Sequence, residues 1–447
     1  MSGLNRELEG LLGGEGAACG VDGYCAPAGD ATTAAEGGDA SPAAAQAAPR
    51  AASSAGGRPA KPARPILPGA TIGVLGGGQL GRMLAHAGSR MGYRFVALDP
   101  TPDAPCGQTA QQIVAGYADR DAARELARRS DVITYEFENV DADVAAMLET
   151  ESYVPQGSAL LHTTQHRLRE KRAIEAAGAR VAPYAEIASL ADLQAAAEQL
   201  GLPAVLKTAT GGYDGKGQWV LRGTDELEPA WAEASRAGTE LVLEKFIDFE
   251  REISVIAARR PSGEIRTFPP AENIHVRNIL HLSIVPARVP DAVIAEAERL
   301  AVSIAETLGA VGLIAVEMFV AHDGTLYVNE LAPRPHNSGH YTMEACRTSQ
   351  FEQHIRAICD LPLGDTALLT PVVMGNILGE HVGPLLDRMQ TRDESGERLG
   401  VAPKVHLYGK AEAKTGRKMG HVNVLADDTE TALAWINEST IWRVNPS

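Results

Sequence analysis

Two glutamates stand where a short hairpin would bring them together. Apolar runs flank an Asp-Gly dipeptide at 323–324, with Glu317 in the first run and Glu330 at the end of the second. Asp-Gly is a favoured sequence for a two-residue hairpin turn. Such a turn would pair His322 with Thr325 and, further along the ladder, Glu317 with Glu330.

Facing carboxylates predict a bound cation. Like charges directly opposite each other destabilise paired strands, whereas Mg²⁺ prefers oxygen ligands and is commonly held by carboxylates together with substrate phosphates. We therefore predict a magnesium site at Glu317 and Glu330. The alternative is a slipped register, which would leave two solvated acids.

A glycine-rich loop upstream would suit the phosphates. The sequence GGYDGKGQ at 211–218 lies between predicted strands at 204–207 and 218–221. It is not a Walker loop, because Lys216 is followed by glycine. Loop amides, with Lys207 at the base and Lys216 inside, would suit a triphosphate, although glycine-rich surface hairpins also occur without a ligand. Together with the paired acids, the loop predicts an ATP site.

A further apolar strand, predicted at 241–247, ends in charged residues and is followed by Glu252. A strand between two domains can bind adenine through its backbone groups while an acid holds the ribose hydroxyls. A salt-bridged surface strand is the alternative.

The first glycine loop, GGGQLG at 76–81, follows a predicted strand at 71–75 and precedes a predicted helix at 82–91. It matches G-x-G-x-x-G, and Asp99 ends the next predicted strand, 94–99, near where a ribose-binding acid is expected. A dinucleotide site, a site for another phosphate ligand and a tight structural turn all remain open.

Composition limits the classes of function. The chain has 447 residues and a formal charge of -16, which argues against general binding to nucleic acid or anionic membranes. No apolar run reaches the roughly 18 residues that span a bilayer, and no signal peptide is evident. Five scattered cysteines fit a reducing cytoplasm. Residues 1–66, rich in Ala, Gly, Ser and Pro, predict a disordered extension.

Strands alternate with helices in the first folded part, which predicts a parallel sheet in an α/β layer. Hairpins follow, and a β-rich segment begins after Pro371; the fold class is therefore α/β and α+β. Beyond the segments above, we predict helices at 165–177, 190–200 and 292–308, and strands at 131–136, 372–374 and 404–408.

Seven segments in order, GGGQLG, GGYDGKGQ, LEKFI, REIS, ENIHVRNIL, VEMF and NELAPRPHNSGH, resemble the ATP-grasp superfamily and, within it, the N5-carboxyaminoimidazole ribonucleotide synthetase family. The resemblance runs from about Pro68 to the C-terminus. It implies an ATP-grasp fold with a Rossmann-like pre-ATP-grasp domain and a small β-rich C-terminal domain, with boundaries at 67–165, 166–368 and 369–447 after the extension.

The resemblance also implies an activity. The family converts 5-aminoimidazole ribonucleotide, bicarbonate and ATP into N5-carboxyaminoimidazole ribonucleotide, ADP and phosphate through carboxyphosphate, in de novo purine (IMP) biosynthesis. Mg²⁺, or Mn²⁺ in its place, is the expected metal, and a homodimer is the expected assembly.

Site residues are carried over from the family by motif. The ATP-binding set is Arg167, Lys207, Gly212, Tyr213, Asp214, Gly215, Lys216, Gly217, Gln218, Glu244, Lys245, Phe246, Ile247, Glu252, His275, Asn329 and Glu330. The ribonucleotide-binding set is Gln79, Leu80, Glu138, Tyr213, Arg334, His336, Asn337, Ser338, Lys404, Lys410 and Arg417. The catalytic set is Arg334, His336, Tyr213 and Lys216, and the metal set is Glu317 and Glu330.

Two positions depart from the simplest expectation. The family commonly has Asp before the arginine, where this chain has His166, so the orientation of Arg167 needs another partner. An ideal pleat places Asn329 on the face opposite Glu330, so a metal role for Asn329 would require a local distortion of the strand.

Three other functions remain as alternatives. Another ATP-grasp ligase, using formate or an amino acid, would share the ATP residues and differ in the substrate loop. An NAD-dependent oxidoreductase would rest on the first glycine loop and Asp99. A non-catalytic regulatory nucleotide-binding protein is disfavoured by the loop lysine and the two metal acids.

Overall fold

The computed structural model describes residues 62–211 and 216–442. The predicted extension up to residue 61 and the loop residues Gly212, Tyr213, Asp214 and Gly215 lie outside the described residues. Ile66, at the end of the predicted extension, is held in place: its N–H donates to the Cys359 carbonyl at 2.9 Å, and its carbonyl accepts from the Tyr93 hydroxyl at 2.6 Å. Within the described part, no helix is long and apolar enough to cross a membrane.

The predicted parallel sheet is present near the N-terminus of the described chain, in the order β3-β2-β1-β4. Buried apolar side chains from its strands and helices form its core. Helix α2 begins at Gln79, three residues before the predicted start, because the glycine loop leads directly into it. The elements are β1 (Thr71–Leu75), β2 (Arg94–Asp99), β3 (Gln111–Val114) and β4 (Val132–Tyr135), with α2 (Gln79–Arg90), α3 (Arg120–Arg129), α4 (Ala142–Glu151) and α5 (Ser158–Thr164).

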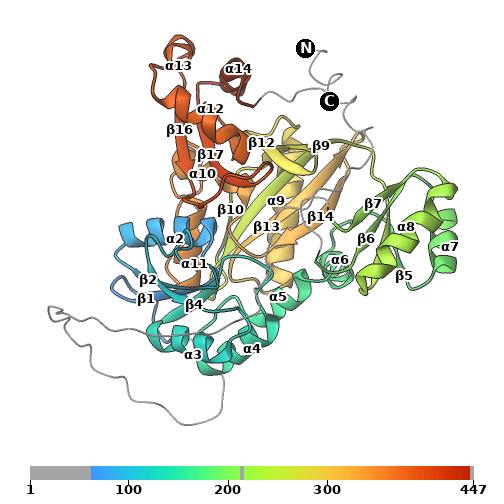
Figure 1. Ribbon diagram of the computed structural model, residues 1–447, viewed down its shortest axis with the longest axis horizontal. Helices are drawn as coiled ribbons and strands as arrows, with labels where there is room; N and C mark the ends of the chain where they lie inside the picture. The colour runs from blue at the N-terminus through green and yellow to red at the C-terminus, as the bar shows by residue number, and fades with distance from the viewer. Residues whose placement is uncertain (1–61, 212–215, 443–447) are drawn as a thin grey trace, which may run out of the picture. The chain divides into compact units, whose positions relative to one another are not determined.

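A small antiparallel sheet carries the second glycine loop, in the order β5-β8-β6-β7. Helices α7 and α8 pack on it and share its apolar core (Figure 1). Strands β6 and β7 form the predicted hairpin around the loop. The elements are β5 (Tyr184–Ile187), β6 (Ala204–Thr208), β7 (Gln218–Leu221) and β8 (Leu241–Lys245), with α6 (Arg167–Ala176), α7 (Leu190–Leu200) and α8 (Leu227–Ala234).

The largest sheet within the described residues follows the order β14-β13-β9-β11-β12-β15-β17-β16, with β10 beside β9. Figure 1 shows β9, β13 and β14 side by side, with helix α9 against them, and their apolar side chains form one core cluster. The strands are β9 (Phe249–Arg259), β10 (Ile265–Thr267), β11 (Ala271–Val276), β12 (Ile279–Val285), β13 (Gly312–Ala321), β14 (Leu326–Ala332), β15 (Val372–Leu378), β16 (Ala402–Leu407) and β17 (Lys418–Leu425).

The large sheet continues past residue 368, where the predicted ATP-grasp domain ends, because β12 pairs with β15. The segment after Pro371 also contains helices as well as the predicted strands. The helices around the large sheet are α9 (Asp291–Thr307), α10 (Thr342–Ala345), α11 (Gln350–Ile358), α12 (Gly379–Met389), α13 (Glu394–Leu399) and α14 (Thr429–Ser439).

The acidic hairpin has the predicted pairing of Glu317 with Glu330, although the turn and the pairing next to the turn differ from the prediction. The predicted pairing of His322 with Thr325 is wrong. The turn is one residue longer, since the Ala321 N–H donates to the Thr325 carbonyl at 2.9 Å and Gly324 adopts a φ of 81°, as in a type I turn closed by a left-handed residue. A bulge around Asn329 then restores the register, because Met318 pairs with Val328 while Glu317 pairs with Glu330.

Candidate active site

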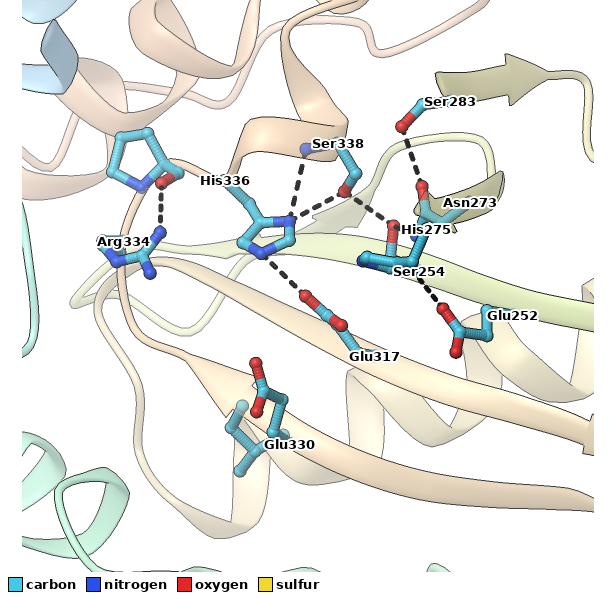
Figure 2. Close-up of polar contacts among 12 residues, drawn as sticks. Glu252, Ser254, Asn273, His275, Ser283, Glu317, Glu330, Arg334, His336 and Ser338 are labelled. Atoms are coloured by element: carbon cyan, nitrogen blue, oxygen red, sulfur yellow. Dashed lines mark hydrogen bonds and ion pairs between the residues drawn. The ribbon is translucent and has the colours of Figure 1, made fainter. Parts of the chain in front are cut away.

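The two predicted metal ligands point from neighbouring strands toward the same space (Figure 2). Exposed fractions are 18% for the Glu317 side chain and 43% for the Glu330 side chain. Removal from bulk water and the charge of Glu317 raise the pKa of Glu330 above its ordinary value. The bulge also brings Asn329 to the small hollow lined by Glu317, which is the distortion that a metal role for Asn329 required. A cation would relieve the repulsion between the two acids.

His336 lies next to the acid pair. Its Nε2 atom is 2.8 Å from Glu317 Oε1. Although burial opposes ionisation, the hydrogen bond from His336, with positive charge nearby at Arg334, lowers the pKa of Glu317 below its ordinary value. Glu317 is therefore a carboxylate at neutral pH, with one oxygen already oriented.

Arg334, in the loop after β14, contacts Glu138 in the segment that follows β4. Its Nη2 donates to Glu138 Oε1 at 3.0 Å, and its Nε donates to the other carboxylate oxygen. Although burial opposes ionisation, the Arg334 guanidinium lowers the pKa of Glu138 to about 2. The pair brings two residues of the predicted ribonucleotide set together from segments far apart in sequence.

Arg167 is oriented without the acid that usually precedes it in the family. Its Nε donates to the Thr208 carbonyl at 3.2 Å, and its Nη1 is 3.8 Å from Glu330 Oε2. His166 contacts Glu240 instead, at 2.7 Å. A backbone carbonyl at the base of the glycine loop thus provides the partner that the sequence left open.

Lys207 is held by a carboxylate that it shares with a second lysine. Its Nζ is 3.0 Å from Glu244 Oε2, while Lys171 Nζ is 3.1 Å from Glu244 Oε1. Although burial opposes ionisation, these ammonium groups lower the pKa of Glu244 to about 2. The Glu244 side chain therefore fixes Lys207 rather than projecting from the strand as a free ligand.

The predicted nucleoside contacts lie on β8 and its extension. The N–H groups of Lys245 and Phe246 already donate to the carbonyls of Pro183 and Pro203, at 2.8 and 3.2 Å, so an adenine would meet other backbone groups, including those of Ile247. Glu252 forms an ion pair with His275. Although burial acts in the opposite direction, that contact raises the pKa of His275.

Asn337 offers a ligand both halves of its amide. Its Nδ2 and Oδ1 atoms are buried and lack hydrogen-bond partners within the described residues. Buried amides are normally satisfied, so this side chain fits the predicted role in binding the ribonucleotide. It directly follows His336 in the loop that also carries Arg334.

The basic residues expected from the C-terminal part lie on or after β16. Lys404 is an exposed residue of that strand. Lys410 Nζ donates to the Lys418 carbonyl at 2.8 Å, and Arg417 Nη1 donates to the Glu412 carbonyl at 2.9 Å. Within the described residues, no hydrogen bond or ion pair links these three to Glu317 or Glu330, so their predicted role rests on the resemblance.

The first glycine loop already binds two acidic side chains of the protein. Both carboxylate oxygens of Glu136 accept hydrogen bonds from the N–H groups of Gly78 and Gly81. Asp99 accepts from the Gly77 N–H at 2.8 Å and from the Tyr117 hydroxyl at 2.6 Å. The amides that would bind a pyrophosphate, and the acid that would bind its ribose, are thus engaged within the protein. This arrangement favours the structural interpretation of the loop over a dinucleotide site.

Glycine is required there for space. A Cβ on Gly78 would lie 2.8 Å from Glu136 Oε1, and one on Gly77 would lie 2.7 Å from the Asp99 Cβ. Leu80 buries its side chain in the core, so a ribonucleotide could contact only its backbone. Gln79, at the start of α2, remains partly exposed.

The structure therefore brings together Glu317, Glu330, His336, Arg334, Glu138, Arg167 and Lys207, while Gly217 and Gln218 close the loop hairpin. Lys216 directly follows loop residues 212–215, which the structure does not describe. Two buried residues near the site were not predicted: Lys171, which contacts Glu244, and Glu170, which accepts from the Leu331 N–H at 2.8 Å. The structural acid Glu136 was not predicted either, although it had a signal as an acid ending a strand beside the glycine loop.

Parts of the chain match known protein families. Three family models match the chain: the ribonucleotide synthetase preATP-grasp domain over residues 69–165, the ATP-grasp domain over 172–351, and the phosphoribosylaminoimidazole carboxylase C-terminal domain over 372–434.

Several similar proteins are N5-carboxyaminoimidazole ribonucleotide synthases. The N5-carboxyaminoimidazole ribonucleotide synthase of Bacillus subtilis is 52% identical over 376 residues, covering 84% of this chain and 96% of that protein. A crystal structure of an N5-carboxyaminoimidazole ribonucleotide synthetase in an ADP complex has a TM-score of 0.81 and 54% identity, covering 85% of this chain and 98% of its own.

The Aspergillus clavatus enzyme in complex with ADP and 5-aminoimidazole ribonucleotide has a TM-score of 0.76 at 31% identity, covering 83% and 98% of the two chains. The chain belongs to the N5-carboxyaminoimidazole ribonucleotide synthase family of ATP-grasp ligases.

Proposed function

We propose that this protein uses ATP and bicarbonate to carboxylate 5-aminoimidazole ribonucleotide, giving N5-carboxyaminoimidazole ribonucleotide, ADP and phosphate in purine biosynthesis. Family membership supports the reaction. The observation that carries the proposal is the acid pair Glu317 and Glu330 with His336 against it and Arg334 beside it. The arrangement places two carboxylates that could bind a cation beside a histidine and an arginine that could bind a small anion.

The acid pair fits Mg²⁺, with Mn²⁺ as a substitute. Within the described residues, no group of three or more His, Cys, Asp or Glu could hold a metal ion, so Glu317 and Glu330 would share the cation with ATP phosphates. When bound, the ion neutralises charge on the transferring phosphoryl group. Asn329 lies close enough to the hollow to assist through its amide oxygen.

The protein's own groups position the reactants. Bicarbonate is a poor electrophile until phosphorylation converts it into carboxyphosphate, which can deliver CO₂ to the weakly nucleophilic amine. Lys207, together with the loop carrying Lys216 and Tyr213, would hold the triphosphate, and Arg334 and His336 would hold the bicarbonate-derived anion against the γ-phosphate. Ser338 and Asn337 would help to seat the ribonucleotide.

Several finer assignments remain predictions. The roles of Gln79, Glu138, Lys404, Lys410 and Arg417 in binding the ribonucleotide follow from the resemblance. A homodimer and a cytoplasmic location also stay predictions.

An ADP-release assay tests the proposed function. Purified protein with Mg·ATP and 5-aminoimidazole ribonucleotide should release ADP when bicarbonate is added to degassed buffer, and N5-carboxyaminoimidazole ribonucleotide should form in equal amount. ADP release that ignores bicarbonate but responds to formate or an amino acid would replace this proposal with another ligase. NAD binding without ATP turnover would replace it with the oxidoreductase.

A further inference from the structure

A line of buried polar side chains leads away from the acid pair, starting at His336 (Figure 2). His336 Nδ1 is 2.8 Å from Ser338 Oγ, which is 2.7 Å from Ser254 Oγ on β9. Asn273 on β11 donates from Nδ2 to Ser254 Oγ at 2.9 Å, and its Oδ1 accepts from Ser283 on β12 at 2.8 Å.

These outer residues are well shielded from solvent. Ser254, Asn273, Ser283 and Ser338 are 2%, 6%, 0% and 1% exposed. Water has little access to replace a lost partner, so each hydrogen must be shared along the line. Neighbouring strands of one sheet supply Ser254, Asn273 and Ser283, which fixes their spacing independently of the loop.

The contacts of His336 Nδ1 decide which way the serine hydrogens point. Either serine can donate in the Ser254–Ser338 contact, but only when Ser254 donates is the Ser338 hydrogen left for His336 Nδ1. The Ser338 backbone N–H points at the same ring nitrogen, at 3.4 Å. A ring nitrogen that accepts hydrogen bonds carries no hydrogen in the neutral imidazole, so the hydrogen is on Nε2.

A second restraint fixes the backbone of this histidine. The Gln350 side chain accepts from the His336 N–H at 2.8 Å and donates to the His336 carbonyl at 2.8 Å. The backbone and the ring of His336 are thus held by separate elements. The Nε2–H then lies 2.8 Å from Glu317 Oε1.

We propose that Ser254 and Asn273 are positioning residues, which set His336 in its Nε2–H tautomer so that it orients Glu317 for the cation. The proposal deepens the proposed function and rests on it for the role of Glu317. Hydrogen-bonded groups behind a metal ligand typically change metal affinity or activity by about 10–100-fold when altered.

Asn273→Asp is the sharpest test, since it keeps the shape and exchanges the donor for an acceptor. A carboxylate at this position would accept from Ser254, and the hydrogens of Ser254 and Ser338 would turn away from His336. We expect the ¹⁵N spectrum of histidine-labelled protein to show His336 changing from Nε2–H to Nδ1–H. The assignment of that signal comes from its loss in His336→Gln.

The same variant should raise the Mg²⁺ concentration at half-maximal activity by about 10–100-fold, with a much smaller change in KM for 5-aminoimidazole ribonucleotide. Mn²⁺ binding followed by electron paramagnetic resonance in the presence of ADP should weaken in parallel. An unchanged tautomer, or a changed tautomer with unchanged metal affinity, would overturn the proposal.

A matched pair at Ser254 keeps the test decisive if Asn273→Asp does not fold. Ser254→Thr retains the hydroxyl and should retain the tautomer and the metal affinity, whereas Ser254→Ala should lose both in part. Equal behaviour of the two variants would contradict the role of the hydroxyl. The tautomer is measured without substrate, so failure of the proposed reaction in the unmodified protein would be seen separately, as absence of bicarbonate-dependent ADP release.

Discussion

Two pairs of acids in this protein have partners of different kinds. Glu136 and Asp99 accept hydrogen bonds from glycine N–H groups of the first loop. Glu317 and Glu330 face each other across two strands, with His336 on one and Arg167 at 3.8 Å from the other. Glu136 is only 5% exposed, whereas the Glu330 side chain is 43% exposed.

The difference shows what separates a structural acid from a ligand-binding one. Backbone N–H groups satisfy the first pair permanently and cannot move away, so these acids hold a loop in shape. The second pair keeps a repulsion that a cation would relieve, and its outer acid is reachable from solvent. Substitutions in the Glu317–Glu330 pair should therefore lower catalytic activity, whereas substitutions in the first pair should lower the free energy of unfolding.

The largest effect is expected from Glu330→Gln. Loss of a cation ligand removes several kcal/mol of transition-state stabilisation, so bicarbonate-dependent ADP formation should fall by about 1000-fold or more. Thermal unfolding should stay near that of the unmodified protein. Glu296→Gln, at an exposed acid of α9 that pairs with Arg299, serves as the control. Full activity in Glu330→Gln would contradict the metal assignment.

Arg334 links the two regions, since it holds Glu138 close to the acid pair. Arg334→Ala should lower kcat by about 100-fold, as for other lost oxyanion contacts, and change KM for ATP much less. Arg334→Lys keeps the charge but not the fork, so its kcat should be intermediate. Steady-state kinetics with saturating bicarbonate decides, and an unchanged kcat in the alanine variant would argue against an anion-binding role.

Glu136→Gln should show the opposite pattern. A glutamine can accept one of the two glycine N–H groups but presents its own NH₂ to the other, leaving a buried donor unpaired at a cost of about 1–3 kcal/mol. Urea unfolding should detect that loss, and kcat of the folded variant should change little. A large fall in kcat with unchanged stability would place Glu136 in the chemistry instead.

The same residue should give stability a pH dependence. Burial raises the pKa of Glu136 from its ordinary 4.5 to about 7, so the folded protein retains a proton that the unfolded chain releases. The free energy of unfolding should fall as pH rises through this window, by at most about 1.4 kcal/mol per pH unit from this group. Unfolding at several pH values checks the slope, and Glu136→Gln should reduce it; an equal slope in both proteins would exclude Glu136 as its source.

The smallest effect is expected from deleting residues 1–61, which precede the described chain. If they are only an extension, kcat, KM and unfolding should remain nearly unchanged. A substantial loss in any of these measurements would assign the segment a role in folding or catalysis.

Much of the fold was predictable because local patterns were strong. The structure has the predicted strands at 71–75, 94–99 and 218–221 and the predicted helix at 190–200 with the same bounds. Strands β9 to β12 were not predicted as separate elements, although Pro261-Ser262-Gly263 between β9 and β10 is a turn signal. The hairpin pairing was right although its turn was wrong, since the longer turn and the bulge at Asn329 compensate each other.

The sequence alone determined which chemical groups are available and in what order, because a motif such as NELAPRPHNSGH places Glu330, Arg334 and His336 within one short segment. Only the tertiary structure decided what each acid does. Glu136 and Glu317 both belong to or adjoin apolar strands, and neither local sequence reveals which groups contact the carboxylate. Their partners, glycine amides for one and His336 backed by Ser254 and Asn273 for the other, come from segments far away in the chain, and long-range packing alone brings those segments together.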